Sequence, residues 1–330
     1  MAVIGNTALT LTDWAKRQDP DSKPARIVEM LSQTNEILTD MLWLEGNLPT
    51  GHRTTTRTGL PAGTYRALNA GIPSEKSTTA QVDETCAMLE SLGVVDEALA
   101  ALNGGTAAFR LSENAAFVEG MNQTMASGIF YNNSALNPAQ FTGLAPRYSD
   151  STAKNGTNII KMGGAGSDNT SIWLVVWGEH TVHGIYPKGS NAGLDHNDMG
   201  IDLVDDGTGK KFRAFRDHYK WNCGVALRDW RYAVRICNID VSDLIADSTG
   251  ASVKLVENMI RAIHRIPNLR LGRAAFYMNR TVREMLDIQA MNKSNVQLSI
   301  KEFDGEFITS LRGVPFRTTD ALLNTEAAVA

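Results

Sequence analysis

Apolar side chains recur at helical spacing along the stretch from Asn103 to Asn133, which opens with an Asn-Gly-Gly break. Polar residues fall mostly between them, so the pattern predicts one amphipathic helix over residues 107–131. At about 1.5 Å per residue such a helix is roughly 35 Å long, about twice the average globular helix. Its apolar stripe consists of Phe109, Ala116, Phe117, Met121, Met125 and Ile129. A stripe of this kind is typical of core packing and by itself indicates no function.

The first 48 residues are expected to form an arm. Pro24 stands where a helix starts and Gly46 where a helix stops, which predicts a helix over residues 24–45. Its apolar face carries Ile27, Leu31, Leu38 and Met41. The breaker-rich segment ahead of Pro24 offers this face no local partner. We therefore expect the face to dock along the long helix or on another chain.

Residues 49–77 are the most unusual part of the sequence. His52–Thr58 has the composition of a β-strand but no large apolar residue on either face, and Thr64–Asn69 is predicted to return beside it after a turn at Gly59–Gly63. An isolated two-stranded hairpin is only marginally stable in water. The hairpin is therefore either a mobile loop or a segment ordered by lying on a neighbouring subunit.

Further along the chain, the pattern becomes β-rich over residues 159–240 and mixed after that. The predicted strands are Ile172–Trp177, continued as a hairpin by Thr181–Tyr186, then Ile201–Val204, Phe212–Phe215, two within Trp221–Ile239, Ala274–Met278, and a C-terminal hairpin from Val296 through an Asp-Gly turn, finished by Val314–Thr318. The predicted helices are Val94–Leu102, Val253–Ile266 and Thr281–Ala290. Helices and strands are segregated, so the fold class is α+β.

Composition and charge narrow the function classes. The chain has 330 residues, 43% of them apolar, which is enough for a real core. A net charge of −4 gives no global field for a polyphosphate, so direct nucleic-acid binding is disfavoured. Three cysteines without Cys-x-x-Cys spacing favour a reducing compartment. The N-terminus lacks signal-peptide features and no apolar run approaches membrane-spanning length, so a soluble cytoplasmic product is expected.

Motifs for cofactor binding and nucleophilic catalysis are incomplete. Gly163–Gly166 lacks the third glycine of a dinucleotide fingerprint, and Gly207–Lys210 lacks the first glycine and the hydroxyl residue of a phosphate loop. Ser151 and Lys154 have the spacing of an acyl-transfer motif but lie in a polar loop without its partners. We expect that the protein binds no cofactor, has no catalytic residue and is not an enzyme.

One cluster could hold a metal. It consists of His180, His183, Asp195, His196 and Asp198. Residues three apart on a strand point to opposite faces, so His180 and His183 do not easily share one ion. A cytoplasmic metal-dependent hydrolase that uses His180, His196 and Asp198 is the alternative function, and we expect no metal.

The order of the predicted parts and three stretches of sequence point to one family. An arm, a hairpin rich in Thr, Gly and Arg, a long helix, a β-rich middle and a compact α+β end follow one another over most of the chain. The stretches are Arg57-Thr-Gly-Leu-Pro-Ala-Gly-Thr-Tyr-Arg66, Phe130-Tyr-Asn-Asn-Ser134 with Phe141-Thr-Gly-Leu144, and Trp221 to Ile236. Together they resemble the major capsid proteins of tailed bacteriophages. None of them is a catalytic signature.

The resemblance implies the capsid fold named after phage Hong Kong 97. Its parts would be an N-terminal arm at 1–48, an extended loop at 49–77, a peripheral domain at 78–240 that contains the spine helix 107–131, and an axial domain at 241–330. The subunit would self-assemble as hexamers and pentamers into the icosahedral shell that encloses a double-stranded DNA genome. Its place would be the virion capsid, assembled in the cytoplasm of the host bacterium.

The family also implies partners. They are other copies of the chain, a portal protein, a scaffolding protein and a decoration (cement) protein, with packaged DNA nearby and no membrane. Some members begin with a charged helical scaffold segment, whereas this chain starts almost directly with the arm, so a separate scaffolding protein is expected. Some members join subunits through an isopeptide bond from a loop lysine, but residues 49–75 contain no lysine and Lys76 lies at the base. A non-covalent shell is expected.

The hairpin carries the predicted polar contacts between subunits. Without an apolar face on His52–Thr58, its order would come from backbone pairing and from arginines that meet carboxylates of a neighbour. The arginines are Arg53, Arg57 and Arg66, and the expected partners are Glu84, Glu90, Glu113 and Glu119.

Overall fold

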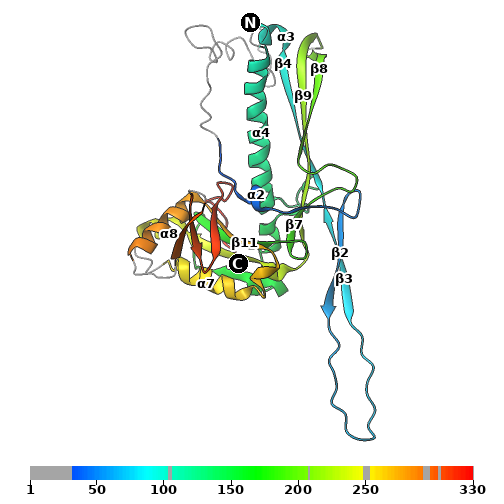
Figure 1. Cartoon of the computed structure of the whole chain (residues 1–330), viewed down its shortest axis with the longest axis vertical. Coiled ribbons are helices and arrows are strands. Elements are labelled where there is room, and N and C mark those ends of the chain that lie inside the picture. The colour runs from blue at the N-terminus through cyan, green and yellow to red at the C-terminus, as the bar shows by residue number, and fades with distance from the viewer. Residues whose placement is uncertain are drawn as a thin grey trace.

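The structure is a computed structural model that describes residues 32–102, 106–206, 209–247, 253–292, 298–303 and 306–329. A long helix stands beside three long strands, and a compact body of strands and helices lies at its lower end (Figure 1). A two-stranded hairpin projects from the body in the opposite direction to the helix (Figure 1). The molecule therefore has one body and two long projections.

The elements are as follows. The α-helices are α2 (Ile37–Asp40), α3 (Glu97–Ala100), α4 (Thr106–Tyr131), α5 (Leu144–Arg147), α6 (Val241–Ala246), α7 (Leu255–Arg265) and α8 (Arg280–Asn292), with 3₁₀ turns η2 (Lys154–Asn158), η3 (Trp230–Tyr232) and η4 (Leu269–Leu271). The strands are β1 (Trp43–Glu45), β2 (Gly51–Gly59), β3 (Thr78–Thr85), β4 (Ala87–Asp96), β5 (Ile159–Lys161), β6 (Asn169–Trp177), β7 (Val182–Tyr186), β8 (Leu194–Asp205), β9 (Lys211–Leu227), β10 (Ala233–Asp240), β11 (Arg273–Met278), β12 (Leu298–Phe303), β13 (Glu306–Leu311) and β14 (Val314–Thr318).

Strand β6 lies at the centre of the body and is buried over its whole length. It pairs antiparallel with β10 on one side and β11 on the other. Because successive side chains on a strand point to opposite faces, β6 divides the interior into two cores. Trp173, Val175 and Trp177 join the core that holds the end of α4, whereas the residues between them join the core under α7 and α8.

Helix α4 confirms the predicted spine helix, within one residue at its start. Its 26 residues make a rod of about 39 Å. The lower end of the helix is buried in the body, where Met125, Ile129 and Phe130 are at most 1% exposed. The upper part lies against β4, whose long antiparallel pairing with β9 continues into β8 (Figure 1). On the upper part of the helix, Leu111 stays 73% exposed.

Two packing details hold the helix in place. Gly143 lies against the last turn of α4, where an added Cβ would come within 2.7 Å of the carbonyl oxygen of Gly128. Higher up, Arg110 donates to the buried carboxylate of Asp217 on β9 at 3.0 Å and lies over the Phe215 ring. The helix is therefore fixed by close backbone contact below and by a charged contact above.

The arm differs from the prediction. Of the helix expected over residues 24–45, the structure shows one turn, α2, followed by strand β1, which pairs in parallel with β7. The strand forms because Trp43 lies directly on Gly184, where an added Cβ would be 2.7 Å from the indole. Tertiary pairing outweighs the weak local helical pattern here. Residues 24–31 lie outside the described residues.

The hairpin also differs in its pairing. Strand β2 confirms the outgoing strand, but it pairs with β3 at Thr78–Thr85, and the predicted return at Thr64–Asn69 is not a strand. The register joins His52 to Glu84 and Arg53 to Asp83. The connection is therefore the 18 residues from 60 to 77 rather than a tight turn at Gly59–Gly63.

Most of the later elements agree with the sequence. The β8–β9 hairpin, β10, α7, α8 and the C-terminal strands lie where they are predicted. Two predictions fail in part. Strand β7 does not form a hairpin with β6 but pairs antiparallel with β9, and β4 runs to Asp96 before the single turn of α3. Asp96 caps that turn, because its carboxylate accepts from the amide of Ala98 at 2.7 Å.

The C-terminal segment returns to the centre of the body. Arg235, on β10, donates to Glu326 Oε2 at 2.9 Å, and Tyr131, at the end of α4, donates to Glu326 Oε1 at 2.5 Å. Both Arg235 and Glu326 are buried, so their charges compensate each other in the interior. The segment after β14 therefore ties the spine helix to the central sheet.

Candidate intersubunit surface

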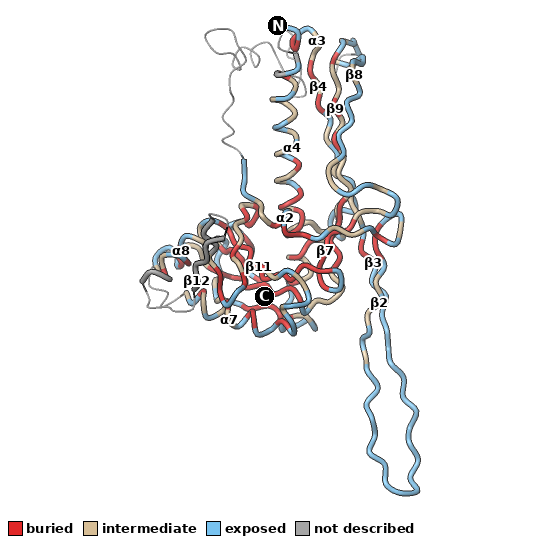
Figure 2. The backbone as a smooth tube through the Cα atoms, viewed as in Figure 1, coloured by how far each residue is buried: buried red, intermediate tan, exposed pale blue. Residues whose placement is uncertain are grey.

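The β2–β3 hairpin leaves most of its surface in solvent (Figure 2). Gly51 and His52 at its root are buried, but no later residue of β2 is, and in β3 only Glu84 is buried. A strand pair of this kind has no core of its own and is marginally stable by itself. Its order depends on the root or on a second surface.

The tip of the hairpin, residues 60–77, is exposed along its whole length. Its large apolar side chains are strongly exposed: Tyr65 is fully exposed, and the exposed fractions are 92% for Leu68, 77% for Leu60 and 66% for Ile72. Exposed apolar groups gathered on one projection are typical of interaction sites. The sequence reasoning missed these four residues because it weighed only His52–Thr58, although the signal was present in the neighbouring stretch.

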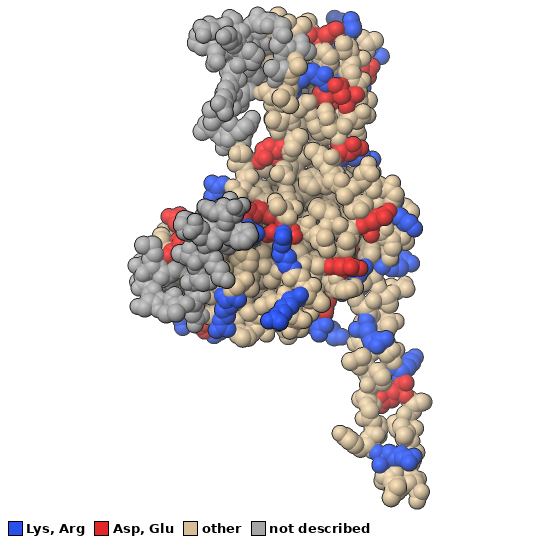
Figure 3. All heavy atoms as spheres, in the orientation of Figure 1, with Lys and Arg blue, Asp and Glu red and all other residues tan. Residues whose placement is uncertain are grey.

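The three predicted arginines differ in their surroundings. Arg53 is already paired inside the hairpin, where its Nε and Nη2 each lie 2.6 Å from an oxygen of Asp83. This hydrogen-bonded pair raises the pKa of Arg53 and lowers the pKa of Asp83. Arg57 and Arg66 are exposed and make no ion pair with any described residue. Basic side chains are spread along the hairpin (Figure 3), and these two remain open to a partner.

The predicted carboxylates also differ in their surroundings, and Glu84 already has a partner in its own chain. Glu84 is buried, and its two oxygens accept from Arg147 at 2.5 and 2.6 Å within the same chain. It is therefore not unmatched charge awaiting a neighbour. Glu90 lies 3.5 Å from Lys220, and Glu119 accepts from the amide of Gln33 at 2.9 Å.

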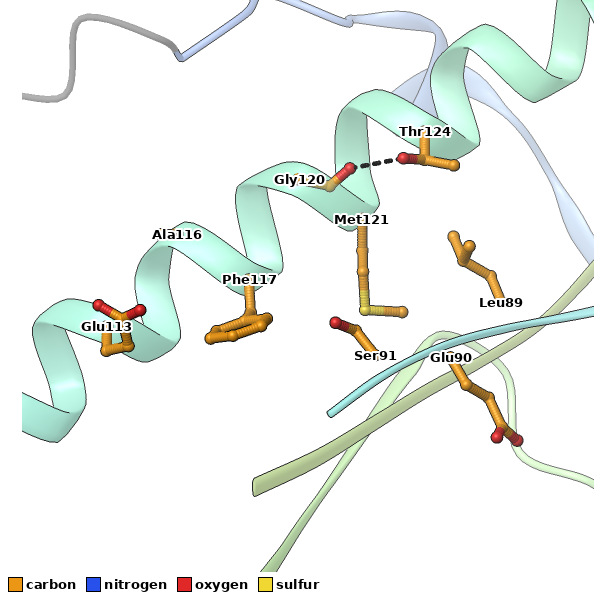
Figure 4. A pocket seen from close by; sticks show the side chains of 9 residues that line it. All are labelled: Leu89, Glu90, Ser91, Glu113, Ala116, Phe117, Gly120, Met121 and Thr124. Atoms are coloured by element: carbon orange, nitrogen blue, oxygen red, sulfur yellow. Dashed lines mark hydrogen bonds between the residues drawn. The ribbon is translucent and has the colours of Figure 1, made fainter. Parts of the chain in front are cut away.

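A groove lies between α4 and β4, with Glu113 of α4 along it, whereas the carboxylate of Glu90 points away from α4 (Figure 4). The side chains of Phe117 and Met121 point from α4 toward β4, and Phe117 stacks on Tyr219 of β9 with ring planes 10° apart. Gly120 leaves an opening, because an added Cβ would meet nothing within 4 Å. The groove is lined by Leu89, Glu90, Ser91, Glu113, Ala116, Phe117, Gly120, Met121 and Thr124. It combines an apolar floor with the acidic side chain of Glu113.

The predicted apolar face of the arm lies partly outside the described residues, since Ile27 and Leu31 do so. Leu38 and Met41 pack in the chain's own core, the one that contains Met125 and Ile129 of α4. Within the single chain these two residues therefore share one core with the lower end of the spine helix.

The metal-site alternative is not supported by the geometry. His196 Nε2 lies 2.9 Å from Asp217, Asp198 lies 2.9 Å from Arg110, and His180 is exposed in the connection between β6 and β7. Within the described ranges, no group of three or more His, Cys, Asp or Glu side chains could hold a metal ion. His196 stacks on Tyr219, with ring centroids 4.6 Å apart, in a contact that packs β8 against β9. The described part of the chain also has no helix long and apolar enough to cross a membrane.

Comparisons with known proteins place the chain in one protein family. The family model described as "Major capsid protein GP7" matches residues 19–330. A chain in a near-atomic structure of bacteriophage Epsilon15 is 38% identical, with a TM-score of 0.81 over 100% of this chain and 99% of that one. A comparison with curated protein sequences found no match.

Two more distant structures share less of the architecture. The capsid of bacteriophage JBD30 has a TM-score of 0.47 at 10% identity, over 77% of this chain and 82% of that one. The SrpI encapsulin complex of Synechococcus elongatus PCC 7942 has a TM-score of 0.47 at 11% identity, over 70% and 97%.

The architecture, with its spine helix and extended hairpin, is the capsid fold named after phage Hong Kong 97. Neither the full-length match to Epsilon15 nor the family model supports the hydrolase alternative. The chain belongs to the major capsid protein GP7 family and is the structural subunit of a tailed phage's shell.

Proposed function

We propose that subunits join when the hairpin tip of one copy lies in the groove between α4 and β4 of its neighbour. The observation that carries this proposal is the exposure of Tyr65 and Leu68 on a projection that its own chain does not cover. The groove supplies a matching surface, because Phe117 and Met121 form an apolar floor beside the open position at Gly120. One tip then meets one groove at every subunit boundary.

Charge complementarity supports the same pairing. Arg57 precedes the apolar part of the tip and Arg66 lies within it, and Glu113 lines the groove. Exposed ion pairs contribute only about 0.2–1 kcal/mol each and weaken with salt. Their role is to select the register of the tip in the groove.

The apolar contact supplies most of the free energy. Burying one large apolar side chain contributes roughly 1.5–3 kcal/mol as an upper estimate. Several such side chains on the tip outweigh the arginine contacts by this reckoning. The apolar side chains of the tip therefore contribute more to this contact than the arginines predicted from the sequence.

Repeating this contact around a ring gives the hexamers and pentamers of an icosahedral shell, since a head-to-tail contact closes when its rotation does. Such a shell encloses double-stranded DNA and forms in the cytoplasm of the host bacterium. The scaffolding, portal and decoration proteins stay predictions of the family resemblance, as do the boundaries of the arm, loop, peripheral and axial domains.

Filling the groove tests the proposal without disturbing the tip. Gly120→Leu places a side chain in open space, and it replaces a helical glycine with a stronger helix former, so the subunit gains stability of about 0.5–1 kcal/mol. We expect the variant subunit to unfold at a higher denaturant concentration than wild type and yet to form fewer closed shells by light scattering and electron microscopy.

Gly120→Ala is the matched control. It gives a similar gain in helix stability but leaves most of the groove open, so its shells should match those of the wild type. Normal shells from Gly120→Leu would show that nothing enters the groove and would overturn the proposed contact.

A further inference from the structure

The root of the hairpin contains a buried group of ionisable side chains that the assembly contact does not use. His52 on β2 is 6% exposed and His183 on β7 is 0% exposed, and their rings meet edge to face with centroids 5.8 Å apart. This ring contact is where the projecting hairpin meets the central sheet. It therefore lies at the point that sets the direction of the hairpin.

The hydrogen bonds at this point require an uncharged His52. Arg228 Nη2 lies 3.0 Å from His52 Nε2, and because a guanidinium can only donate, this nitrogen must accept. The other ring nitrogen, Nδ1, has no hydrogen-bond partner among the described residues. Both nitrogens of His183 lack a hydrogen bond of ordinary geometry within the same part of the chain. A proton added to His52 Nδ1 would have no acceptor among the described residues, and at His183 only the backbone of Gly178 favours the protonated ring.

The nearby carboxylate of Glu84 already forms an ion pair with an arginine. Glu84 is the cross-strand partner of His52, and both of its oxygens accept from Arg147, which follows α4 in the short helix α5. With neutral histidines the group holds two arginines and one carboxylate, a net charge of +1. Protonation of both rings would raise this charge to +3 in a site with little access to water, which is unfavourable.

The pKa shifts agree with this geometry. Burial, followed by the charge of Arg228, lowers the pKa of His52, and Glu84 acts weakly in the opposite direction. Burial lowers the pKa of His183 to about 4, helped by Arg228, His52 and, least of all, the exposed His180, and opposed by the backbone of Gly178.

We propose that the root of the hairpin is an acid-sensitive hinge, in which protonation of His52 and His183 separates β2 from β7 and frees the hairpin to change direction. The hinge is a property of the single subunit. Its consequence for shells rests on the proposed function, since a hairpin that swings would leave the groove of its neighbour.

The sign of the pH dependence follows from proton linkage. The open state exposes histidines of ordinary pKa near 6.5, whereas the closed state holds His183 at about 4, so the open state binds more protons as the pH falls. Closure is fully favoured above pH 6.5 and weakens below it. At pH 5 His183 alone raises the opening constant about 30-fold over its value at pH 7.5.

Hydrogen exchange on unassembled subunits tests the hinge apart from assembly. We expect amides at the root, in 51–53 and 83–85, to lose protection about 30-fold between pH 7.5 and pH 5 after correction for intrinsic exchange rates. Amides of β6 should keep their protection, because the central strand does not open. Equal loss in β6 would indicate general unfolding and would overturn the hinge.

Two variants and a control locate the effect. His183→Leu and His52→Gln are uncharged at every pH, and the Gln side chain still offers an acceptor to Arg228, so each should flatten the pH profile at the root. His264→Gln, which changes an exposed histidine on α7, should leave the profile unchanged. A profile that persists in both root variants would refute the proposal.

A measurement on the wild type covers the case in which these variants fail to fold. Nuclear magnetic resonance titration of the histidine ring protons should show two of the six histidines staying neutral until the root amides lose protection. If all six histidines titrate near their ordinary pKa while the root stays protected, His52 and His183 do not control the hinge.

Discussion

Arg147 and Glu84 join the hairpin to the end of the spine-helix region through two hydrogen bonds of 2.5 and 2.6 Å, although they are 63 residues apart in sequence. Their side chains are 15% and 7% exposed. The guanidinium also donates to the backbone carbonyls of Thr142 and Val225. One arginine thus connects the β3 strand, the α4–α5 connection and β9.

Glu84→Gln should destabilise the subunit by about 3 kcal/mol. Removal of one partner from a buried ion pair leaves the other charge without compensation, which costs about 3–5 kcal/mol, and the remaining carbonyl contacts of Arg147 place the loss at the lower end. Chemical denaturation of unassembled subunits, followed by circular dichroism, measures the change.

The neighbouring residue supplies the control. Asp83→Asn breaks the Arg53 pair on the exposed face of the same strand, where water screens the charges, so the denaturation midpoint should not move. Equal losses for Glu84→Gln and Asp83→Asn would contradict a special role for the buried pair.

Arg57→Glu should lower the yield of closed shells and make closure more sensitive to salt, with the isolated subunit still folded by circular dichroism. Arg57 is exposed and makes no ion pair in the described part of its own chain, so reversing its charge affects only contacts with another subunit. Arg57→Lys keeps the charge and should assemble normally. If Arg57→Glu assembles like wild type at both low and high salt, the arginine is merely a solvated surface residue.

Deletion of residues 1–31 should prevent closed shells without unfolding the subunit. The apolar residues Ile27 and Leu31 belong to this segment, and the chain enters the described region beside α4, where Gln33 bonds to Glu119. A deletion that extends to residue 46 would be a poor test, because it also removes Ile37 and Met41 from the core. Normal shells from the shorter deletion would show that the segment is dispensable.

A denaturing gel of assembled shells should show one band near 35.9 kDa. The reason is that residues 49–75 contain no lysine for an isopeptide bond, and the tip contact is non-covalent. A ladder of heavier bands that survives boiling and reductant would reveal a covalent link between subunits.

The long elements could be predicted from the sequence because their periodicity agrees with their packing. In α4 the predicted stripe residues Phe109, Met121, Met125 and Ile129 are all buried, and Phe117 is half-buried. Ala116 is the exception, since it lines the open groove. The apolar stripe alone does not show which of its residues stay uncovered when the single chain folds.

The failures are places where distant residues decide the local structure. Trp43 lies in a strand because Gly184, on the paired strand, leaves room for its ring. The residues near Trp43 in the sequence give no sign of this pairing. The return strand at Thr78–Thr85 is almost wholly polar, so alternation was too weak to mark it. Likewise, Glu84 resembles a surface carboxylate in the sequence until Arg147 is placed beside it.

Density from electron cryomicroscopy of assembled shells tests the central claim most directly. The account predicts that residues 60–77 of one subunit lie between α4 and β4 of the next, with Tyr65 or Leu68 near the open position at Gly120. Closed shells in which this groove is empty and the tip projects into solvent, or lies on another surface, would contradict it.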